Sequence, residues 1–345
     1  MPSTLVTSHP PFATASPREK LADFPATYRL QDLGELAPGV PLLPVALNDA
    51  GQIALYGHAP ERQAKLSCVR GYVWRDGARL ESGSVFGGVP LTSLSGNGLV
   101  AGQQRVGSGP LHAWASHREG FGAELWPEAE SSASGVNSAG EVAGHVTFVT
   151  NGRARRRVFL YDGSAPRLLP VPSGANAVAM ALNDSGTVLA NVACGLFETQ
   201  SQVALWWGDA VTMIRPEPGG GIWGTALTPG GRVCGRLMTA QGNIRAFLHE
   251  GGRTYDLNAT STFQSEALGA NDARVVVGRF MDDSGRREAF RWTPVDGFRA
   301  LGELVRGAPD WVLQKAVAVN AAGWIAGTGL RDGMLRGFLL MPVST

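Results

Sequence analysis

Short apolar runs alternate with polar positions along most of the chain, and each run ends at a turn signal. One unit, Val45-Ala-Leu-Asn48 with the Asn-x-x-Gly turn and the second apolar run that follow it, returns six more times. At spacings of 42 to 49 residues, the positions aligned with Asn48, called the anchors below, are Ser95, Asn137, Asn183, Thr228, Asn271 and Asn320. The apolar residues do not follow the 3.6-residue period of a helix, so the pattern predicts an all-β repeat protein.

Each unit carries the signals of four strands. The anchor ends the first strand, and its turn leads into a second, as in Glu141-Val-Ala-Gly144. A third strand has an aromatic or aliphatic centre, as in Ala246-Phe-Leu248, and a hairpin signal leads into a fourth. A period in the low-to-middle forties is typical of one four-stranded blade, so we predict a seven-bladed β-propeller of four-stranded blades.

The two ends of the chain complement each other. The segment Tyr28–Leu36 alternates like a strand but precedes the first unit, whereas the last third strand, Leu335–Leu340, has no fourth strand after it. We therefore predict that the N-terminal strand closes the last blade and removes the exposed edges. The predicted organisation is a flexible N-terminal arm over residues 1–27 and a propeller over residues 28–345.

Positions around each anchor predict the packing of the blades. The residue one place before it is apolar, as in Leu182, and is expected to pack between neighbouring blades because successive strand residues face opposite sides. We interpret Asn and Gly in the turn as residues that tolerate positive φ, so Arg274 in place of the glycine predicts a different turn. Small residues two places before the anchor suit strands crowded about an axis: Ala46, Ser93, Gly135, Ala181, Ala226, Gly269 and Ala318.

Composition narrows the classes of function. The net charge is +1, with 30 basic and 29 acidic residues, so we expect neither nucleic acid nor a membrane surface as a partner. The three cysteines are widely spaced and encode neither a disulfide framework nor a zinc site. No apolar run is long enough for a membrane span or a signal-peptide core, and we expect a cytoplasmic protein.

The repeated Asn-x-x-Gly-x-Val-Ala-Gly turn, the His112-Ala113-Trp114 strand and the Asp32-Leu33-Gly34 strand resemble the HAF-repeat family. The resemblance covers roughly Tyr28 to Leu340. It implies a β-propeller and supplies no common activity or catalytic residues. The family is described as extracellular repeats, whereas residues 1–27 here lack an export signal, and our expectation of a cytoplasmic location follows the N-terminus.

The predicted topology separates two faces of the ring. Turns between first and second strands, and between third and fourth strands, are short in nearly every unit. The connections between second and third strands, and those between successive units, are predicted to be long. Because neighbouring strands run in opposite directions, these connections lie together on one side of the ring, called the long-loop face. Because binding and catalysis are concentrated on loops held by a rigid scaffold, we expect the functional site there.

Two sets of polar positions border that face. After the second strands, the second-strand set is His58, Gln103, His145, Asn191, Arg236, Arg279 and Thr328. At the start of the third strands, the third-strand set is Arg70, His112, Arg157, Val203, Arg245, Glu288 and Arg336. Arg and His donors suit the oxygens of a carboxylate, phosphate or enolate. The alternative is that these groups satisfy loop carbonyls at strand ends.

Aromatic residues and one basic segment add to the candidate site. Five aromatic residues lie in the long connections and would form either apolar walls for a ligand or plugs that seal the ring: Phe86, Trp126, Trp223, Phe263 and Trp311. The segment Asn151–Arg157 holds four arginines, which would bind an acidic partner or form a solvated loop.

Three classes of function fit these features. Our first hypothesis is a soluble binding module for a peptide or for an anionic or aromatic small molecule on the long-loop face, with no cofactor. The alternative is a metal-independent cyclase, lyase or isomerase in which His58 or His145 acts as acid and base and arginines stabilise an oxyanion. A structural scaffold is the third class, and a metal held by both histidines with Glu61 and Glu198 is the weakest signal. Fold alone does not rank these classes.

Overall fold

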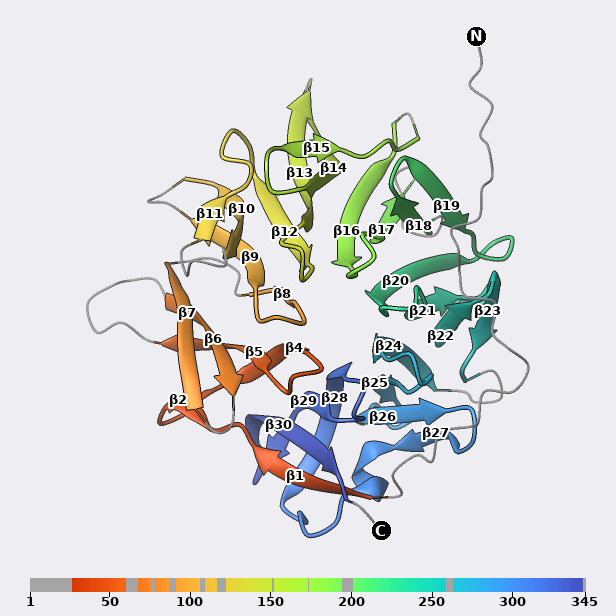
Figure 1. Cartoon of the computed structure of the whole chain (residues 1–345). Helices are drawn as coiled ribbons and strands as arrows, with labels where there is room; N and C mark the ends of the chain where they lie inside the picture. Colours follow the sequence, from red (N-terminus) through yellow and green to blue (C-terminus); the bar gives the residue numbers. More distant parts are fainter. Residues whose placement is uncertain are drawn as a thin grey trace.

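A computed structural model describes residues 27–59, 68–75, 78–86, 91–105, 109–116, 122–150, 152–172, 174–193, 201–258 and 263–343. Seven four-stranded antiparallel sheets stand like blades around a central axis (Figure 1), which confirms the predicted seven-bladed β-propeller. Apart from residue 27, the predicted N-terminal arm lies outside the described residues.

The strands of each blade follow one another from the axis outward. Blades 1 to 3 comprise β4 (Leu43–Leu47), β5 (Ile53–Ala59), β6 (Cys68–Arg75) and β7 (Ala78–Phe86); β8 (Ser93–Leu94), β9 (Val100–Arg105), β10 (Leu111–Ser116) and β11 (Gly122–Glu124); and β12 (Ser131–Val136), β13 (Val142–Thr150), β14 (Arg153–Tyr161) and β15 (Pro166–Leu168). Blades 4 to 6 comprise β16 (Asn176–Leu182), β17 (Val188–Ala193), β18 (Ser201–Trp207) and β19 (Ala210–Ile214); β20 (Gly221–Leu227), β21 (Val233–Met238), β22 (Ile244–Glu250) and β23 (Arg253–Asp256); and β24 (Gln264–Ala270), β25 (Val276–Met281), β26 (Arg287–Thr293) and β27 (Gly297–Ala300). Blade 7 comprises β28 (Trp311–Val319), β29 (Ile325–Arg331), β30 (Met334–Pro342) and β1 (Tyr28–Asp32). The short β2 (Glu35–Ala37) and β3 (Val40–Pro41) pair with each other, and one 3-10 helix, η2 (Leu301–Leu304), precedes β28.

The N-terminal strand closes the ring as predicted. β1 pairs antiparallel with β30, from Tyr28 opposite Pro342 to Asp32 opposite Phe338. Tyr28 is 1% exposed and belongs to the core of blade 7, and its hydroxyl accepts a hydrogen bond of 3.2 Å from Arg291 of blade 6. The last blade is therefore completed by residues more than 300 positions away in the chain.

The small residues before the anchors let adjacent inner strands approach closely. A Cβ atom on Gly135 would lie 2.4 Å from the backbone nitrogen of Leu182, and one on Gly269 would lie 2.9 Å from Cα of Ala318. Both contacts join neighbouring blades, which confirms the crowding expected at the axis. Six of the seven inner strands also carry a register shift just before this position, as between Ala133 and Gly135, so a bulge bends each of these six at the same level.

The anchor asparagines tie the blades into a ring. Asn183 accepts the backbone N–H of Thr187 at 2.9 Å within its own turn, and its Nδ2 donates to the carbonyl of the next anchor, Thr228, at 3.1 Å. The same bond to the next anchor is made by Asn48, Asn137 and Asn271, and Asn320 joins the last blade to the first by donating to the carbonyl of Asn48 at 3.2 Å. The anchors do not have positive φ, so our explanation for asparagine was wrong: the side chain is needed as acceptor and donor together.

The prediction of a different turn at Arg274 was also wrong. The backbone N–H of Arg274 donates to Asn271 at 3.1 Å, just as Gly51 donates to Asn48. Arg274 adopts a φ of 63° and therefore takes the left-handed conformation that glycine has in the other turns. Its Nε donates to Glu250 at 2.9 Å, which offsets part of the cost of that conformation.

Glycines on second strands make room for aromatic side chains on third strands. In blade 7, a Cβ on Gly327 would lie 2.3 Å from the carbonyl oxygen of Lys315 and 2.4 Å from Cζ of Phe338. Blades 3, 5 and 6 repeat this pairing of glycine with phenylalanine, whereas blade 4 pairs Ala190 with Ala204. The glycine of the repeat motif is therefore required by the phenylalanine opposite it.

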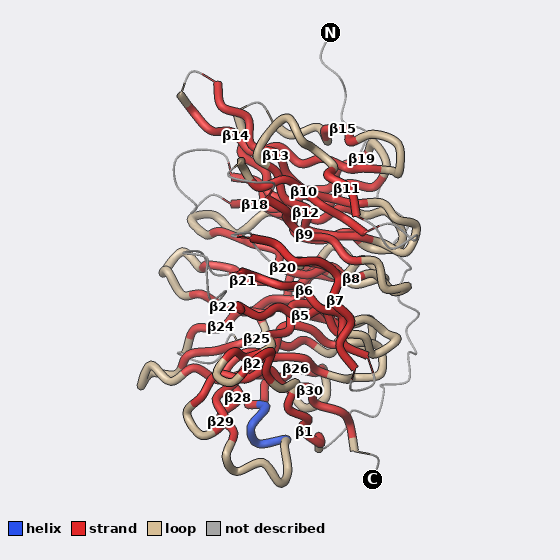
Figure 2. The backbone as a smooth tube through the Cα atoms, turned by 90° about the vertical axis from the view of Figure 1, so that its left-hand side faces the viewer, coloured by secondary structure: helices blue, strands red, loops and turns tan. Residues whose placement is uncertain are grey.

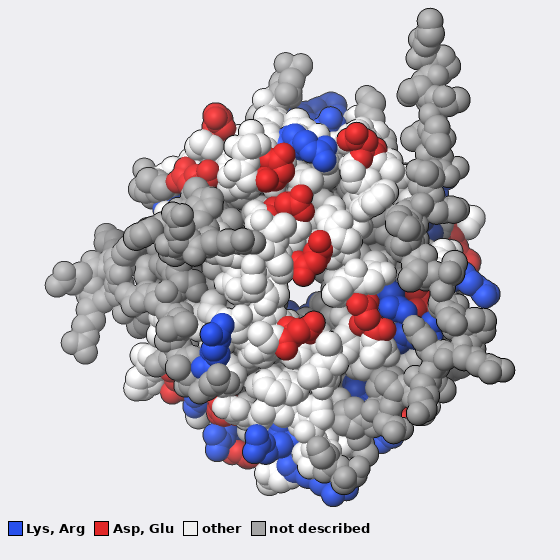
Figure 3. All heavy atoms as spheres, viewed as in Figure 1, with Lys and Arg blue, Asp and Glu red and all other residues white. Residues whose placement is uncertain are grey.

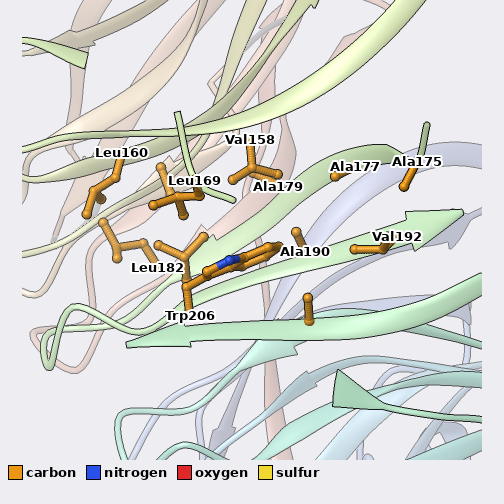
Figure 4. Close-up of a cluster of buried hydrophobic side chains, with 13 residues drawn as sticks. Val158, Leu160, Leu169, Ala175, Ala177, Ala179, Leu182, Ala190, Val192 and Trp206 are labelled. Atoms are coloured by element: carbon orange, nitrogen blue, oxygen red, sulfur yellow. The ribbon is translucent and has the colours of Figure 1, made fainter. Parts of the chain in front are cut away.

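Hydrophobic clusters fill the spaces between blades. Figure 4 shows the cluster between blades 3 and 4, in which Leu160 and Leu182 lie beside Trp206. Trp206 is 1% exposed, and its indole nitrogen donates to the carbonyl of Pro170 at 3.0 Å. The position of Leu182 confirms that the apolar residue before an anchor packs between neighbouring blades.

Four of the connections between second and third strands are shorter than predicted. The turns between second and third strands span residues 151–152, 239–243, 282–286 and 332–333 in blades 3, 5, 6 and 7. The connections between blades remain longer, and the one before β28 contains η2. Figure 2 shows the ring from the side, with the β13–β14 hairpin extending beyond its neighbours. In blades 3, 5, 6 and 7 the long-loop face is thus formed by the links between blades together with compact hairpins.

Candidate functional site

The strand pairing shows that one member of the second-strand set was aligned incorrectly. His145, Asn191, Arg236 and Arg279 lie opposite inner-strand residues at one common level, as Arg236 lies opposite Trp223. In blade 1 that level is occupied by Tyr56, opposite Leu43. His58 lies two residues further along β5, so its assignment to this set was wrong, and its side chain lies outside the described residues.

Two members of this set hold neighbouring blades together. Asn191 bonds both backbone groups of Gly224 in the next blade, donating to its carbonyl at 2.9 Å and accepting from its N–H at 2.8 Å. Gln103 donates to the carbonyl of Ser131 in the next blade at 3.2 Å. These contacts fit the alternative role, in which polar groups at strand ends satisfy backbone groups and do not bind a ligand. Thr328 lies at the same level in blade 7, opposite Lys315.

The third-strand set does not converge with the second-strand set. Arg245 lies opposite Leu237, one residue away from Arg236, so the two arginines project from opposite faces of the sheet. Arg245 donates to the carbonyl of Asn258 at 2.6 Å and lies 3.7 Å from Asp256. The set also needs a correction in blade 4, where the register places Gln202 rather than Val203 at the level of Arg245.

Other members of the third-strand set also have charged partners within the protein. His112 contacts Glu124 at 3.1 Å, Arg336 contacts Glu35 at 2.9 Å, and Glu288 accepts from Arg286 at 2.8 Å. Arg70 lies on β6 opposite Gly57, and its side chain is outside the part of the chain that the structure describes. Arg157 lies on the β13–β14 hairpin. The sequence thus predicted polar strand ends but not the side to which each points.

His145 is half-buried, with one ring nitrogen fully enclosed. It lies on β13 opposite Ser132, and its Nδ1 atom is buried without a hydrogen-bond partner among the described residues. Burial lowers the pKa of His145 to about 4, and the nearby positive charge of Arg156 lowers it further. The ring is therefore neutral near pH 7, which favours a packing role over proton transfer.

This pKa predicts how stability depends on pH. Unfolded His145 binds a proton below about pH 6.5, whereas the folded ring resists protonation down to about pH 4. Lowering the pH from 6.5 to 4 should therefore favour the unfolded state by about 2–3 kcal/mol through this residue. Urea unfolding of the wild type and of His145→Gln at several pH values should show that the free energy of unfolding falls less in the variant as the pH is lowered. Parallel profiles would contradict this prediction.

Arg236 and Arg279 lie together in a groove between blades 5 and 6. The groove has a volume of about 200 Å³ and opens on the long-loop face. Glu266 of β24 binds Arg279 through two contacts of 2.7 and 3.0 Å and lies 4.0 Å from Arg236. The Arg-lined groove, as we call it, is bordered by Arg236, Glu266, Arg279, Phe280, Met281 and Arg287.

The groove carries an excess of positive charge. Three arginines line it against one glutamate, and no carboxylate in the described ranges forms an ion pair with Arg287. Lys315 of the next inner strand adds a fourth cation, and its pKa is lowered by burial and by Arg279. Arg236 is also held in place, because its guanidinium lies 4.9 Å from the ring of Trp223.

The aromatic residues of the long connections mostly serve as plugs. Trp126 packs against Phe148 and Phe159 at centroid distances of 6.1 and 5.5 Å. Trp311 lies 6.2 Å from Phe338, in the core cluster of blade 7. Phe263 packs against Phe280 and Phe298 at 5.0 and 5.4 Å, which supports the apolar wall of the Arg-lined groove. The side chain of Phe86 lies outside the described residues.

The opposite face, formed by the anchor turns, is acidic near its centre. Figure 3 shows acidic side chains gathered around a central opening. Asp49, Asp184 and Asp272 follow anchors, and each accepts a backbone N–H from the turn of the preceding blade at 2.7 to 3.0 Å. These carboxylates therefore join blades to one another, which accounts for the acidity of this face.

Metal and thiol chemistry find little support among the described residues. Within the described ranges, no group of three or more His, Cys, Asp and Glu side chains could hold a metal ion. Cys234 is buried, and burial raises the pKa of its thiol to about 12. Glu61, Glu198 and Cys194 lie outside these ranges. The described part of the chain also contains no helix long and apolar enough to cross a membrane.

The overall fold is shared with solved β-propellers. One is an oligogalacturonate lyase from Vibrio parahaemolyticus, with a TM-score of 0.58 at 9% identity over 91% of this chain and 97% of that one. Another is an acylaminoacyl peptidase from Pyrococcus horikoshii, with a TM-score of 0.57 at 9% identity over 89% of this chain and 52% of that one. The chain thus spans about half the length of the peptidase. No protein-family model and no curated protein sequence matches the chain. Similarity at this identity defines the class as a β-propeller, and the likeness to the HAF-repeat family stays an interpretation of the sequence.

Proposed function

We propose that this protein is a binding module whose Arg-lined groove takes the carboxylate of a small molecule or of a peptide. The observation that supports this proposal is the arrangement of Arg236, Arg279 and Arg287 around a single glutamate. Arginine binds carboxylates through its N–H donors, and two donors of Arg279, Nε and Nη2, already converge on Oε2 of Glu266. A ligand carboxylate would take the donors that Glu266 leaves available.

The size of the groove limits the ligand. Its volume of about 200 Å³ is smaller than that of most pockets for whole metabolites. It suits one end group, such as a peptide C-terminus with an apolar side chain resting on Phe280 and Met281. The proposed role is therefore recognition of a terminal carboxylate with a small apolar neighbour.

Titration calorimetry with two matched peptides tests this role. The probe is an acetylated tripeptide that ends in phenylalanine, with either a free carboxylate or an amide at its C-terminus. We expect the amide to bind about tenfold more weakly or worse, because it loses a charge-assisted pair of hydrogen bonds. Equal binding of the two peptides, or binding of neither, would refute the proposal.

Variants of the groove should change affinity in opposite directions. Arg279→Gln should weaken binding of the free acid by about tenfold or more, and Glu266→Gln should strengthen it because a competing carboxylate is removed. The matched control is Arg299→Gln, which removes an arginine paired with Glu303 on the outer strand of the same blade. A loss of affinity in the control as large as that in Arg279→Gln would show that the effect is not local.

A further inference from the structure

Within the described ranges, β13 extends further past its anchor than any other second strand. β13 ends thirteen residues after its anchor, whereas β9, β17, β21 and β25 end ten residues after theirs. Three additional residue pairs extend the hairpin by about 10 Å. Its two strands stay in register up to Thr150 opposite Arg153, and Figure 2 shows the hairpin extending from the ring. The arginine segment that the sequence allowed as a solvated loop is therefore mostly β-strand.

Three arginines form a ladder on one face of this hairpin. Arg153, Arg155 and Arg157 alternate along β14, so their side chains leave the same side of the strand about 7 Å apart. Their cross-strand partners are Thr150, Phe148 and Val146. Because Phe148 packs against Trp126, the base of the ladder is anchored to the body of blade 3.

The charges of the three ladder arginines are not neutralised within the described part of the fold. Among the residues described, no carboxylate forms an ion pair with Arg153, Arg155 or Arg157. Arg155 donates only to the backbone carbonyl of Gly174. Near the tip, Val149 is 72% exposed. The hairpin thus presents the exposed Arg153, the half-buried Arg155 and Arg157, and the apolar Val149 at the surface.

The outer edge of β14 is also open near the ladder. β15 pairs with Phe159–Tyr161, the N–H of Leu169 donates to the carbonyl of Val158 at 2.9 Å, and no strand of the described chain pairs with residues 153–157 on that side. The N–H of Arg156 faces this edge and already donates to the side chain of Asn176 at 3.1 Å, so the part of the edge open to a peptide begins at Ala154. Because backbone groups alternate along a strand, those of Ala154 face the same edge, where an extended peptide can add as a strand.

We propose that the β13–β14 hairpin docks an extended acidic peptide segment of a partner protein. Alternate side chains of an extended chain repeat at about 7 Å, which matches the spacing of the three arginines. Aspartate or glutamate at every second position would pair with the ladder, and the open edge would set the register. A peptide is favoured over nucleic acid because the whole chain has a net charge of only +1 and a phosphate backbone demands a broad basic surface.

Fluorescence anisotropy with a labelled twelve-residue peptide of alternating glutamate and threonine tests this docking. The triple variant R153Q/R155Q/R157Q should bind about tenfold more weakly or worse, and a glutamine–threonine peptide should not bind the wild type. The matched control is R29Q/R215Q/R253Q, which makes the same change in net charge at other surface arginines. It should stay within about twofold of the wild type because screening limits distant charges.

Three results would overturn the proposal. One is an equal loss in both triple variants, which would indicate general electrostatic attraction. Another is binding that the hairpin substitutions leave unchanged. The third is tighter binding of a twelve-nucleotide oligothymidylate that the same hairpin substitutions abolish, which would assign the ladder to nucleic acid. Thermal melting checks that both triple variants are folded, as expected for substitutions on a surface hairpin.

Discussion

Replacing Tyr28 by alanine should lower the free energy of unfolding by about 3–5 kcal/mol. The side chain is 1% exposed and lies in the core of blade 7, where it joins the first described strand to the last. Its removal would leave a cavity in the core cluster of blade 7 and take a hydrogen-bond acceptor from the buried Arg291. The expected result combines lost apolar burial with weakened closure of the ring. Equilibrium unfolding in urea, followed by circular dichroism, measures it.

Tyr28→Phe separates the two causes. It keeps the ring and removes only the hydroxyl that accepts the 3.2 Å hydrogen bond from Arg291. We expect this variant to lose about 1–2 kcal/mol, the cost of leaving a buried donor with one partner fewer. A loss in Tyr28→Ala no greater than that in Tyr28→Phe would mean that packing of β1 contributes little to closure.

Gly327→Ala should be the second large effect, with a loss of about 3 kcal/mol. The new Cβ would lie 2.3 Å from the carbonyl oxygen of Lys315 and 2.4 Å from the ring of Phe338. Both distances are far below contact, so either the inner strand or the aromatic ring must move. Urea unfolding monitored by tryptophan fluorescence gives the change in stability.

Two further variants identify the cause of that loss. At Gly302, a Cβ would meet nothing within 4 Å, so Gly302→Ala should change stability by no more than about 0.5 kcal/mol. The double variant Gly327→Ala with Phe338→Ala reproduces the alanine pair of blade 4, Ala190 with Ala204. It should be more stable than the sum of the single losses implies, by about 1 kcal/mol or more. Strict additivity would show that the ring is not the obstacle.

Much of the architecture could be predicted because it rests on local periodicity. The spacing of the anchors set the number of blades, and the unpaired strand at Tyr28 predicted the closure with β30. The role of the anchor asparagines could not be predicted in the same way. Asn320 donates to Asn48 across 272 positions, a contact that exists only once the ring has closed.

The candidate site was predicted only in part. Arg236 and Arg279 lie in the groove, but Glu266 and Lys315 were missed because each lies on an inner strand, Glu266 opposite Arg279 in blade 6 and Lys315 in blade 7. His58 was misplaced because Gly57 was aligned with the glycines of the other second strands, whereas the pairing in blade 1 places Tyr56 at that level. A single displaced glycine is enough to shift such an alignment by two residues.

The sequence by itself determined the all-β class, the seven blades and the overlap of the chain ends, because strand alternation and turn chemistry act over a few residues and repeat along the chain. Only the tertiary structure decided which polar strand ends hold blades together and which border a groove. That choice depends on the face of the sheet from which each side chain projects and on the blade beside it. Asn191 and Arg236 occupy equivalent positions, yet Asn191 bonds the backbone of Gly224 whereas Arg236 lies in a groove with Glu266.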